Sequence, residues 1–186
     1  MGFHMAAVWI VLVHVVLPLW ALCGFLDYLC HRAGHIECAS GARETLVHWL
    51  MLAEVGLPLG LAVFFRIDAL VLAIGLVCLV VHEITGHLDL RLAMATRRVT
   101  IFEHQVHSFL EVLPLAAILL VMTLHWPQTL ALFGLGPERA DFTLALKPPP
   151  RWPEIARPAA VLLVLVLLPY AEELMRGARR AAGAGR

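Results

Sequence analysis

The chain has 186 residues, of which 61% are hydrophobic and only 15% carry a formal charge. Its mean hydropathy of +0.83 lies far above that of water-soluble domains and indicates a membrane protein. The formal net charge is zero and the basic residues are scattered, which argues against nucleic acid as a partner. The four cysteines show no paired spacing, so no disulfide framework is predicted.

Five apolar runs follow one another, each close to the roughly 20 residues that an α-helix needs to cross the hydrocarbon core. They cover residues 5–26, 45–65, 69–84, 110–126 and 158–174. No Lys or Arg precedes the first run and no small-residue cleavage motif follows it, so we expect a retained helix. The sequence therefore predicts an all-α, polytopic membrane helix bundle of about five spans, with four or six as alternatives.

The connecting segments differ in character. Residues 88–103, between spans three and four, mix apolar and basic residues, which is typical of an interfacial helix. Residues 127–157 predict a long loop with a proline-rich portion, and a disordered tail is expected at the C-terminus. We expect one integral-membrane domain, with metal-site helices in residues 1–126 and the last span and tail in 158–186.

Basic residues in short loops predict sidedness. Nine Lys and Arg residues fall in the first and third connections and the tail, against five in the second and fourth connections. This excess predicts that the first and third connections face the cytoplasm. The Ala, Leu and Arg bias is compatible with a bacterial protein in the inner membrane.

Seven of the ten histidines fall at one predicted membrane face, while His14 lies mid-span and His4 and His125 belong to the other side. These three are expected to be structural. A single histidine at a membrane boundary is more often a hydrogen-bonded residue than a ligand, so the prediction of a site depends on the clustering. Residues three or four apart share a helix face. Histidines and carboxylates recur at these steps: Asp27, His31 and His35; Glu44 and His48; Glu83 and His87; Glu103 and His107; His104, His107 and Glu111.

Imidazole and carboxylate together suit iron, manganese or zinc, and helix bundles build two-metal sites from such residues. Ionisable groups are costly in a membrane, and seven imidazoles exceed the needs of one zinc ion, which favours two metals. The predicted ligands are His31, His35, His48, His82, His87, His104, His107, Glu83 and Glu111. The carboxylates predicted to orient these ligands, or to pair with nearby arginines, are Asp27, Glu44, Glu103 and Asp89.

The arginine pair Arg97 and Arg98 allows two interpretations. Basic residues beside a span commonly anchor it to anionic headgroups. The pair would also suit the polar head of a substrate held near the metals.

Two motifs carry a family resemblance. HRAGH, from His31 to His35, has the form HxxxH, and EHQVH, from Glu103 to His107, contains HxxH. Both resemble the histidine boxes of the integral-membrane di-iron fatty acid desaturase and hydroxylase superfamily. The arrangement of an arginine and then Glu-His shortly before His107 is loosely similar to the histidine box of the plasmanylethanolamine desaturase group. The resemblance covers about residues 27–111, and the chain departs from it because no adjacent His-His pair occurs.

The resemblance implies two Fe ions at the cytoplasmic face, with His31, His35, His104 and His107 among their ligands. It also implies that O2 oxidises a C–H bond of a lipid or other apolar substrate, by hydroxylation or desaturation. Electrons would come from a separate donor, a ferredoxin or cytochrome type of reductase.

Three alternatives remain open from the sequence. A membrane zinc metallohydrolase would use Glu83 or Glu103 as general base, although His82-Glu83 is followed by His87 at a spacing that does not complete HExxH. A b-type cytochrome or electron carrier would ligate haem by paired histidines, with His14 and His48 as the deep pair. A structural or transport protein would use the ionisable groups as a proton path.

Overall fold

The computed structural model describes residues 2–39, 42–148 and 152–184. It confirms the all-α membrane bundle, because five helices are long and apolar enough to cross a bilayer. These candidate spans are Phe3–Ala33, Arg43–Phe64, Ala69–Thr96, Ile101–Leu124 and Ala156–Gly183. Among the described residues the only extended pairing is one isolated bridge between Phe65 and Leu146.

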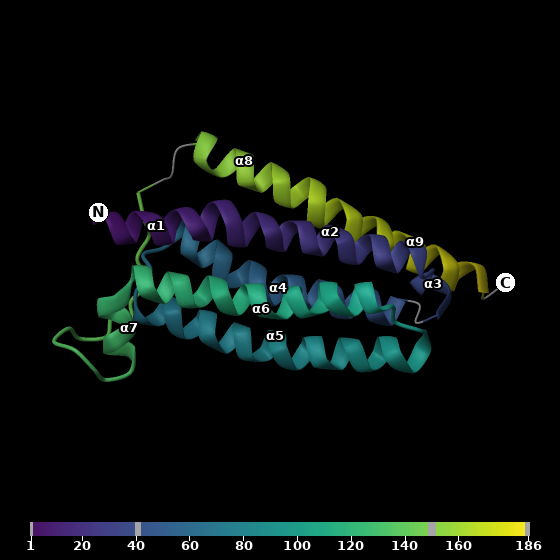
Figure 1. The fold of residues 1–186 in the computed structure, drawn as a ribbon, viewed down its shortest axis with the longest axis horizontal. Coiled ribbons are helices and arrows are strands. Elements are labelled where there is room, and N and C mark those ends of the chain that lie inside the picture. The colour runs from purple at the N-terminus through teal and green to yellow at the C-terminus, as the bar shows by residue number, and fades with distance from the viewer. Residues whose placement is uncertain (1, 40–41, 149–151, 185–186) are drawn as a thin grey trace.

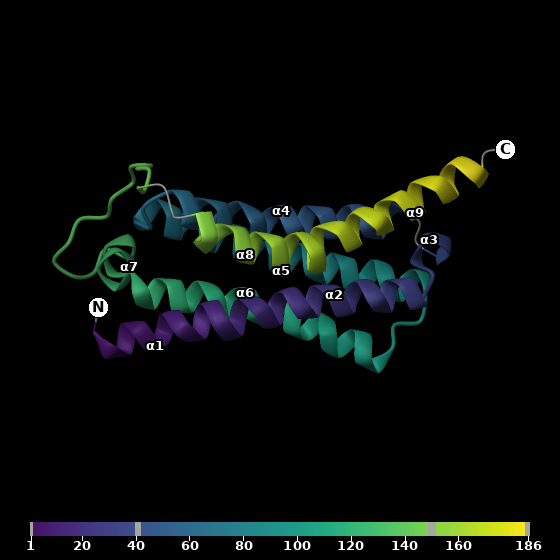
Figure 2. The same ribbon diagram turned by 90° about the horizontal axis from the view of Figure 1, so that it is seen from above.

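The five long rods lie side by side and run roughly parallel to one axis (Figures 1 and 2). The elements up to the fourth rod are α1 (Phe3–Val11), the π-helical turn η1 (Leu12–Val16), α2 (Leu17–Ala33), α3 (Ile36–Ala39), α4 (Ala42–Phe64), α5 (Ala69–Thr96) and α6 (Ile101–Leu124). They are followed by α7 (Trp126–Leu132), α8 (Trp152–Leu162), the π-helical turn η2 (Leu163–Leu167) and α9 (Leu168–Ala184). The N-terminus and α7 lie at one end of the bundle, and α3 and the C-terminus lie at the other.

Two clusters of buried apolar side chains hold the rods together. Val16 and Cys23 pack with Val106 and Leu113 where the first rod meets α6. Ala21 packs with residues of the last rod, including Tyr170. Many large apolar side chains point outward, as expected of a surface that faces lipid instead of water.

The segment 88–103 differs from its prediction as an interfacial helix. The first nine of its residues continue α5 to Thr96, and after a short link α6 begins at Ile101. Leu, Ala, Met and Arg are strong helix formers, and the buried Asp89 and Ala93 keep this stretch packed against the bundle. The side chain of Thr100 caps α6 by accepting a hydrogen bond from the Glu103 backbone N–H.

The fourth connection and the tail also contain more helix than predicted. Trp126–Leu132 forms α7, with a proline in its first turn, and the last rod begins at Trp152 instead of residue 158. Helix α9 continues to Ala184, because the expected disordered tail is rich in alanine and arginine. Part of the predicted proline-rich portion, residues 149–151, lies outside the described residues.

Candidate metal centre

A set of ionisable side chains meets inside the bundle, toward the end that carries α3. Three helices each contribute a carboxylate four residues before a histidine, a spacing that puts both on one helix face. We define the His–carboxylate cluster as these pairs together with one carboxylate each from α5 and α9: Asp27 and His31, Glu44 and His48, Glu103 and His107, Asp89, and Glu173. Each of the eight residues is at most 6% exposed.

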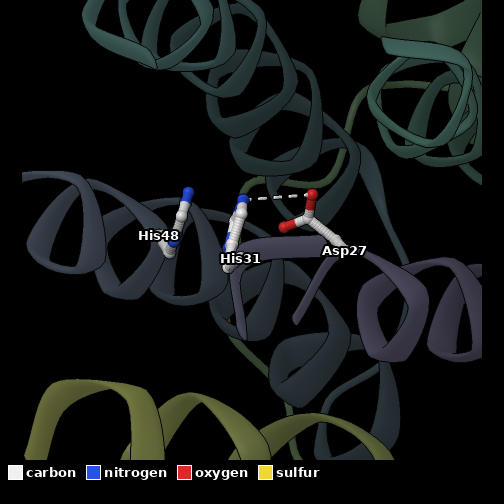
Figure 3. Close-up of side chains that lie close together, drawn as sticks. All are labelled: Asp27, His31 and His48. Carbon is white, nitrogen blue, oxygen red and sulfur yellow. Dashed lines mark ion pairs between the residues drawn. The ribbon is translucent and has the colours of Figure 1, made fainter. Parts of the chain in front are cut away.

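The closest part of the cluster joins α2 to α4 (Figure 3). Ligand atoms of Asp27, His31 and His48 all lie within 4.8 Å of one another, so these three could hold one metal ion. The rings of His31 and His48 are stacked, with centroids 4.5 Å apart.

The Nδ1 atoms of all three imidazoles face oxygen atoms. Nδ1 of His31 and Nδ1 of His48 each lie 3.1 Å from one carboxylate oxygen of Glu173. Nδ1 of His107 lies 3.0 Å from the backbone carbonyl oxygen of Glu103. Because ionised carboxylate and carbonyl oxygens only accept hydrogen bonds, the tautomer that donates from Nδ1 is favoured in His31 and His107, which leaves the lone pair on Nε2. His48 lies within hydrogen-bond distance of a carboxylate at both ring nitrogens.

The Nε2 atom of His31 points at oxygen atoms that cannot donate to it. It lies 3.4 Å from Asp27, and 3.9 Å and 3.8 Å from Glu44 and Glu103. It has no hydrogen-bond partner among the described residues. A buried lone pair that faces carboxylates is repelled by them unless a cation lies between.

Asp89 faces Nε2 of the other two rings. Its Oδ1 lies 3.2 Å from Nε2 of His48, and its Oδ2 lies within hydrogen-bond distance of the same atom at 3.3 Å. Oδ2 also lies 3.4 Å from Nε2 of His107. Charge-assisted hydrogen bonds are about 2.7–2.9 Å long, whereas two ligands of one metal ion, each about 2.0–2.2 Å from it, lie roughly 3.0–3.5 Å apart. By contrast, Arg97 lies 2.6 Å from Glu44. The distances between Asp89 and the two imidazoles are therefore long for charge-assisted bonds and are compatible with ligands that share an ion.

Negative charge exceeds positive charge in the cluster. Arg97 contacts both Glu44 and Glu103, and it is the fixed cation that the described residues bring to the five carboxylates. Burial opposes the charged guanidinium, but the contacts with Glu103 and Glu44 outweigh it and raise the pKa of Arg97. With neutral imidazoles, four negative charges stay uncompensated, which is costly inside a membrane.

Six predicted ligands lie elsewhere. Four of them have exposed side chains: His35, Glu83, His87 and His104. His35 follows the end of α2 with a positive φ of 51° and lies 3.5 Å from Glu37. His82 is buried on α5 seven residues before Asp89, and the half-buried Glu111 lies one turn after His107 on α6. The predicted orienting carboxylates Asp27, Glu44, Asp89 and Glu103 are all cluster members.

Sequence reasoning missed two contributions from the last helix. Glu173 holds His31 and His48, and the hydroxyl of Tyr170 donates to Asp27 at 3.1 Å. The signal was present in the adjacent Glu172 and Glu173 that close the last apolar run. Of these two carboxylates only Glu173 enters the cluster, because Glu172 faces outward to Arg32.

Comparison of the chain with protein-family models, with curated proteins and with solved structures finds no match, so the chemistry of this site must be inferred from its own residues.

Proposed function

We propose that the protein is a membrane-bound non-haem di-iron oxidase, a hydroxylase or desaturase that uses O2 to oxidise a C–H bond of a lipid or other apolar substrate. The observation that carries the proposal is the orientation of three imidazoles. Their Nδ1 atoms are held by Glu173 and the Glu103 carbonyl, and their Nε2 atoms face carboxylates inside the bundle.

The count of charges favours two ions over one. Two divalent cations would neutralise the four negative charges left by five carboxylates and Arg97, whereas a single zinc ion would leave two. Iron is well suited to mixed imidazole and carboxylate ligands in a helix bundle. The residues that would hold the ions are His31, His48, His107, Asp27 and Asp89, with Glu44 and Glu103 available beside Arg97.

The chain supplies position and a dry environment. Bound iron would contribute O2 activation, which no side chain can provide. Glu173 would hold the rings of His31 and His48 at fixed angles, and Tyr170 would orient Asp27 by its hydrogen bond. The burial of these groups keeps bulk water from the reacting centre.

A cavity of about 400 Å³ lies beside the cluster and suits an amphiphilic substrate. Its wall includes the apolar Leu26, Leu29 and Phe102, the cluster residue Glu103, and Arg98. Arg97 is already paired with carboxylates, whereas Arg98 is exposed and makes no ion pair with the described residues. We therefore assign the predicted headgroup contact to Arg98 rather than to Arg97.

Binding of matched amphiphiles tests this assignment. Hexadecyl phosphate and hexadecanol share a chain and differ in charge, so Arg98→Gln should weaken binding of the first and not of the second. Arg91→Gln removes an exposed arginine outside the cavity and serves as the control. Equal loss in both variants would indicate general attraction to the membrane face.

The distribution of basic residues also suggests on which side of the membrane the cluster lies. The cluster lies toward the end of the bundle that holds the larger number of basic residues, so we propose that it faces the cytoplasm, in a bacterial inner membrane. A separate reductase of the ferredoxin or cytochrome type would then supply electrons from that side.

The alternatives fit this geometry less well. Haem with two axial histidines needs one ring on each side of the porphyrin, but His31 and His48 stack directly on each other. The side chain of His14 is exposed, and its Nδ1 lies 3.3 Å from the Ile10 carbonyl oxygen. A zinc hydrolase is the second candidate, because the same ligands suit zinc.

Elemental analysis of the purified chain, followed by an O2-consumption assay after chemical reduction, decides between these candidates. We expect about two iron ions per chain, no Soret absorption, and O2 uptake that depends on the reductant. Zinc without iron would contradict the proposal in favour of the hydrolase.

A further inference from the structure

A second group of buried polar side chains lies deeper in the bundle. Glu54 on α4 is 8% exposed, and His82 on α5 is 4% exposed. His82 precedes Asp89 by seven residues on the same helix, which corresponds to about 10 Å along its axis. The group is therefore separate from the His–carboxylate cluster.

Three ligand atoms in this group have no hydrogen-bond partner among the described residues: Nδ1 and Nε2 of His82, and Oε2 of Glu54. Nδ1 of His82 lies 3.6 Å from Oε2 of Glu54, which is too long for a hydrogen bond. The hydroxyl of Thr85 donates to the other oxygen of Glu54 at 2.8 Å and so fixes the carboxylate. An imidazole and a carboxylate left unpaired in a membrane interior are costly.

A second carboxylate approaches from α6. Gly86 follows His82 by one helical turn, and a Cβ atom added there would lie 3.7 Å from Oε1 of Glu111. The same position would lie 3.4 Å from the terminal methyl group of Met51. The carboxylate of the half-buried Glu111 therefore lies against α5 at Gly86, one helical turn after His82.

We propose that Glu54 and His82 bind a second cation, a divalent transition metal such as zinc or manganese, with Glu111 as the neighbouring carboxylate that balances its charge. Tetrahedral ligands about 2.0–2.1 Å from an ion lie roughly 3.3 Å apart, close to the 3.6 Å between His82 and Glu54. Two carboxylates and a neutral imidazole become electrically neutral with one divalent ion. Imidazole nitrogen and carboxylate oxygen are also ligands that such metals accept.

Zinc binding by the full-length chain in detergent tests the site. The protein is stripped with a chelator, loaded with Zn²⁺ and freed of excess metal, and the bound zinc is counted per chain. Glu54→Gln and His82→Asn should each bind one Zn²⁺ fewer than the unmodified chain. The control His87→Ala removes an exposed histidine of the same helix and should bind the full number.

The result is separable from the proposed di-iron centre. His107→Ala, which alters that centre, should keep the Zn²⁺ equivalent that Glu54→Gln loses. Size-exclusion profiles in the same detergent establish that each variant is folded, and the nearly isosteric Glu54→Gln carries the test if His82→Asn is not. Unchanged zinc content in a folded Glu54→Gln would overturn the second site and leave the first untouched, and it would indicate a plain Glu54–His82 ion pair.

Discussion

The imidazole rings of His31 and His48 stack face to face, with centroids 4.5 Å apart and planes 5° apart. The rings come from α2 and α4, and both direct Nδ1 to the carboxylate of Glu173 on α9. One side chain of the last helix therefore fixes the orientation of two rings on two other helices. The arrangement leaves both Nε2 atoms on the side that holds Asp27 and Asp89.

Replacing Glu173 by glutamine should weaken metal binding without removing a ligand. The amide keeps the shape but cannot accept from both Nδ1–H groups, so at least one ring loses its fixed orientation. Loss of such an orienting carboxylate typically costs 10–100-fold in affinity, and we expect about that change for Fe²⁺. Competition with a chelator of known affinity measures it.

The matched control is Glu172→Gln. Glu172 is adjacent in sequence but bonds Tyr28, Arg32 and Arg176 outside the cluster. Metal affinity equal to that of the unmodified chain is expected for it. Equal affinities of Glu173→Gln and Glu172→Gln would show that Glu173 does not orient the ligands.

His107→Ala and His104→Ala should differ although the residues lie three positions apart. His107 is 6% exposed and faces Asp89, whereas His104 is exposed. We expect His107→Ala to lose most of the bound iron and His104→Ala to retain it, as measured by elemental analysis. Iron loss in both variants would instead favour the ligand set implied by the histidine-box resemblance, which includes both residues.

Arg97→Gln should destabilise the protein. The guanidinium contacts Glu44 and Glu103, and its removal leaves two buried carboxylates without their cation. Breaking a buried ion pair in this way costs on the order of 3 kcal/mol, so the apparent melting temperature in detergent should fall by several degrees. Arg98→Gln, at the neighbouring exposed position, should melt with the unmodified chain; a similar fall in both variants would contradict the assignment.

His125, at the other end of the bundle, should make stability depend on pH. Burial, and secondly the charge of Lys147, lower the pKa of His125. In the unfolded chain a histidine titrates near about pH 6.5, so between the two pKa values the unfolded state binds more protons than the folded state. The contribution of neutral His125 to the free energy of unfolding is fully present above about pH 6.5. It is lost as the pH falls from there through the pKa of His125 in the folded state.

Melting temperatures measured between pH 8 and pH 5 test this sign. The unmodified chain should lose stability as pH falls, and His125→Gln should flatten part of that decline. His4→Gln removes an exposed histidine near the N-terminus and should leave the slope unchanged. A steeper decline in the His125 variant would mean that the protonated ring is stabilised instead.

The sequence predicted the bundle because bilayer thickness sets both the length and the composition of a span. It also placed His31, His48 and His107 with their carboxylates, since a spacing of four guarantees a shared helix face. Spacing does not determine which face turns inward. In α6 the face of Glu103 and His107 is buried and that of His104 is exposed, and only contact with the other helices decides between them.

Glu173 and Glu54 were missed for a related reason. Neither has a histidine three, four or seven residues away on its own helix. Each contacts a histidine that lies more than 25 positions away in the sequence. Such pairings depend on how the helices are arranged around one another, which local periodicity does not contain.

The π-helical turn η2 sets the rotation of the final rod. A π turn accommodates one residue more than an α-helical turn, so everything after Leu167 is turned relative to a regular helix by about 100°. Deleting one residue within η2 would carry the carboxylate of Glu173 around the circumference, away from the two rings that it holds. The π-helical turn η2 therefore determines which face of α9 is turned toward the cluster, and it places Glu173 on that face.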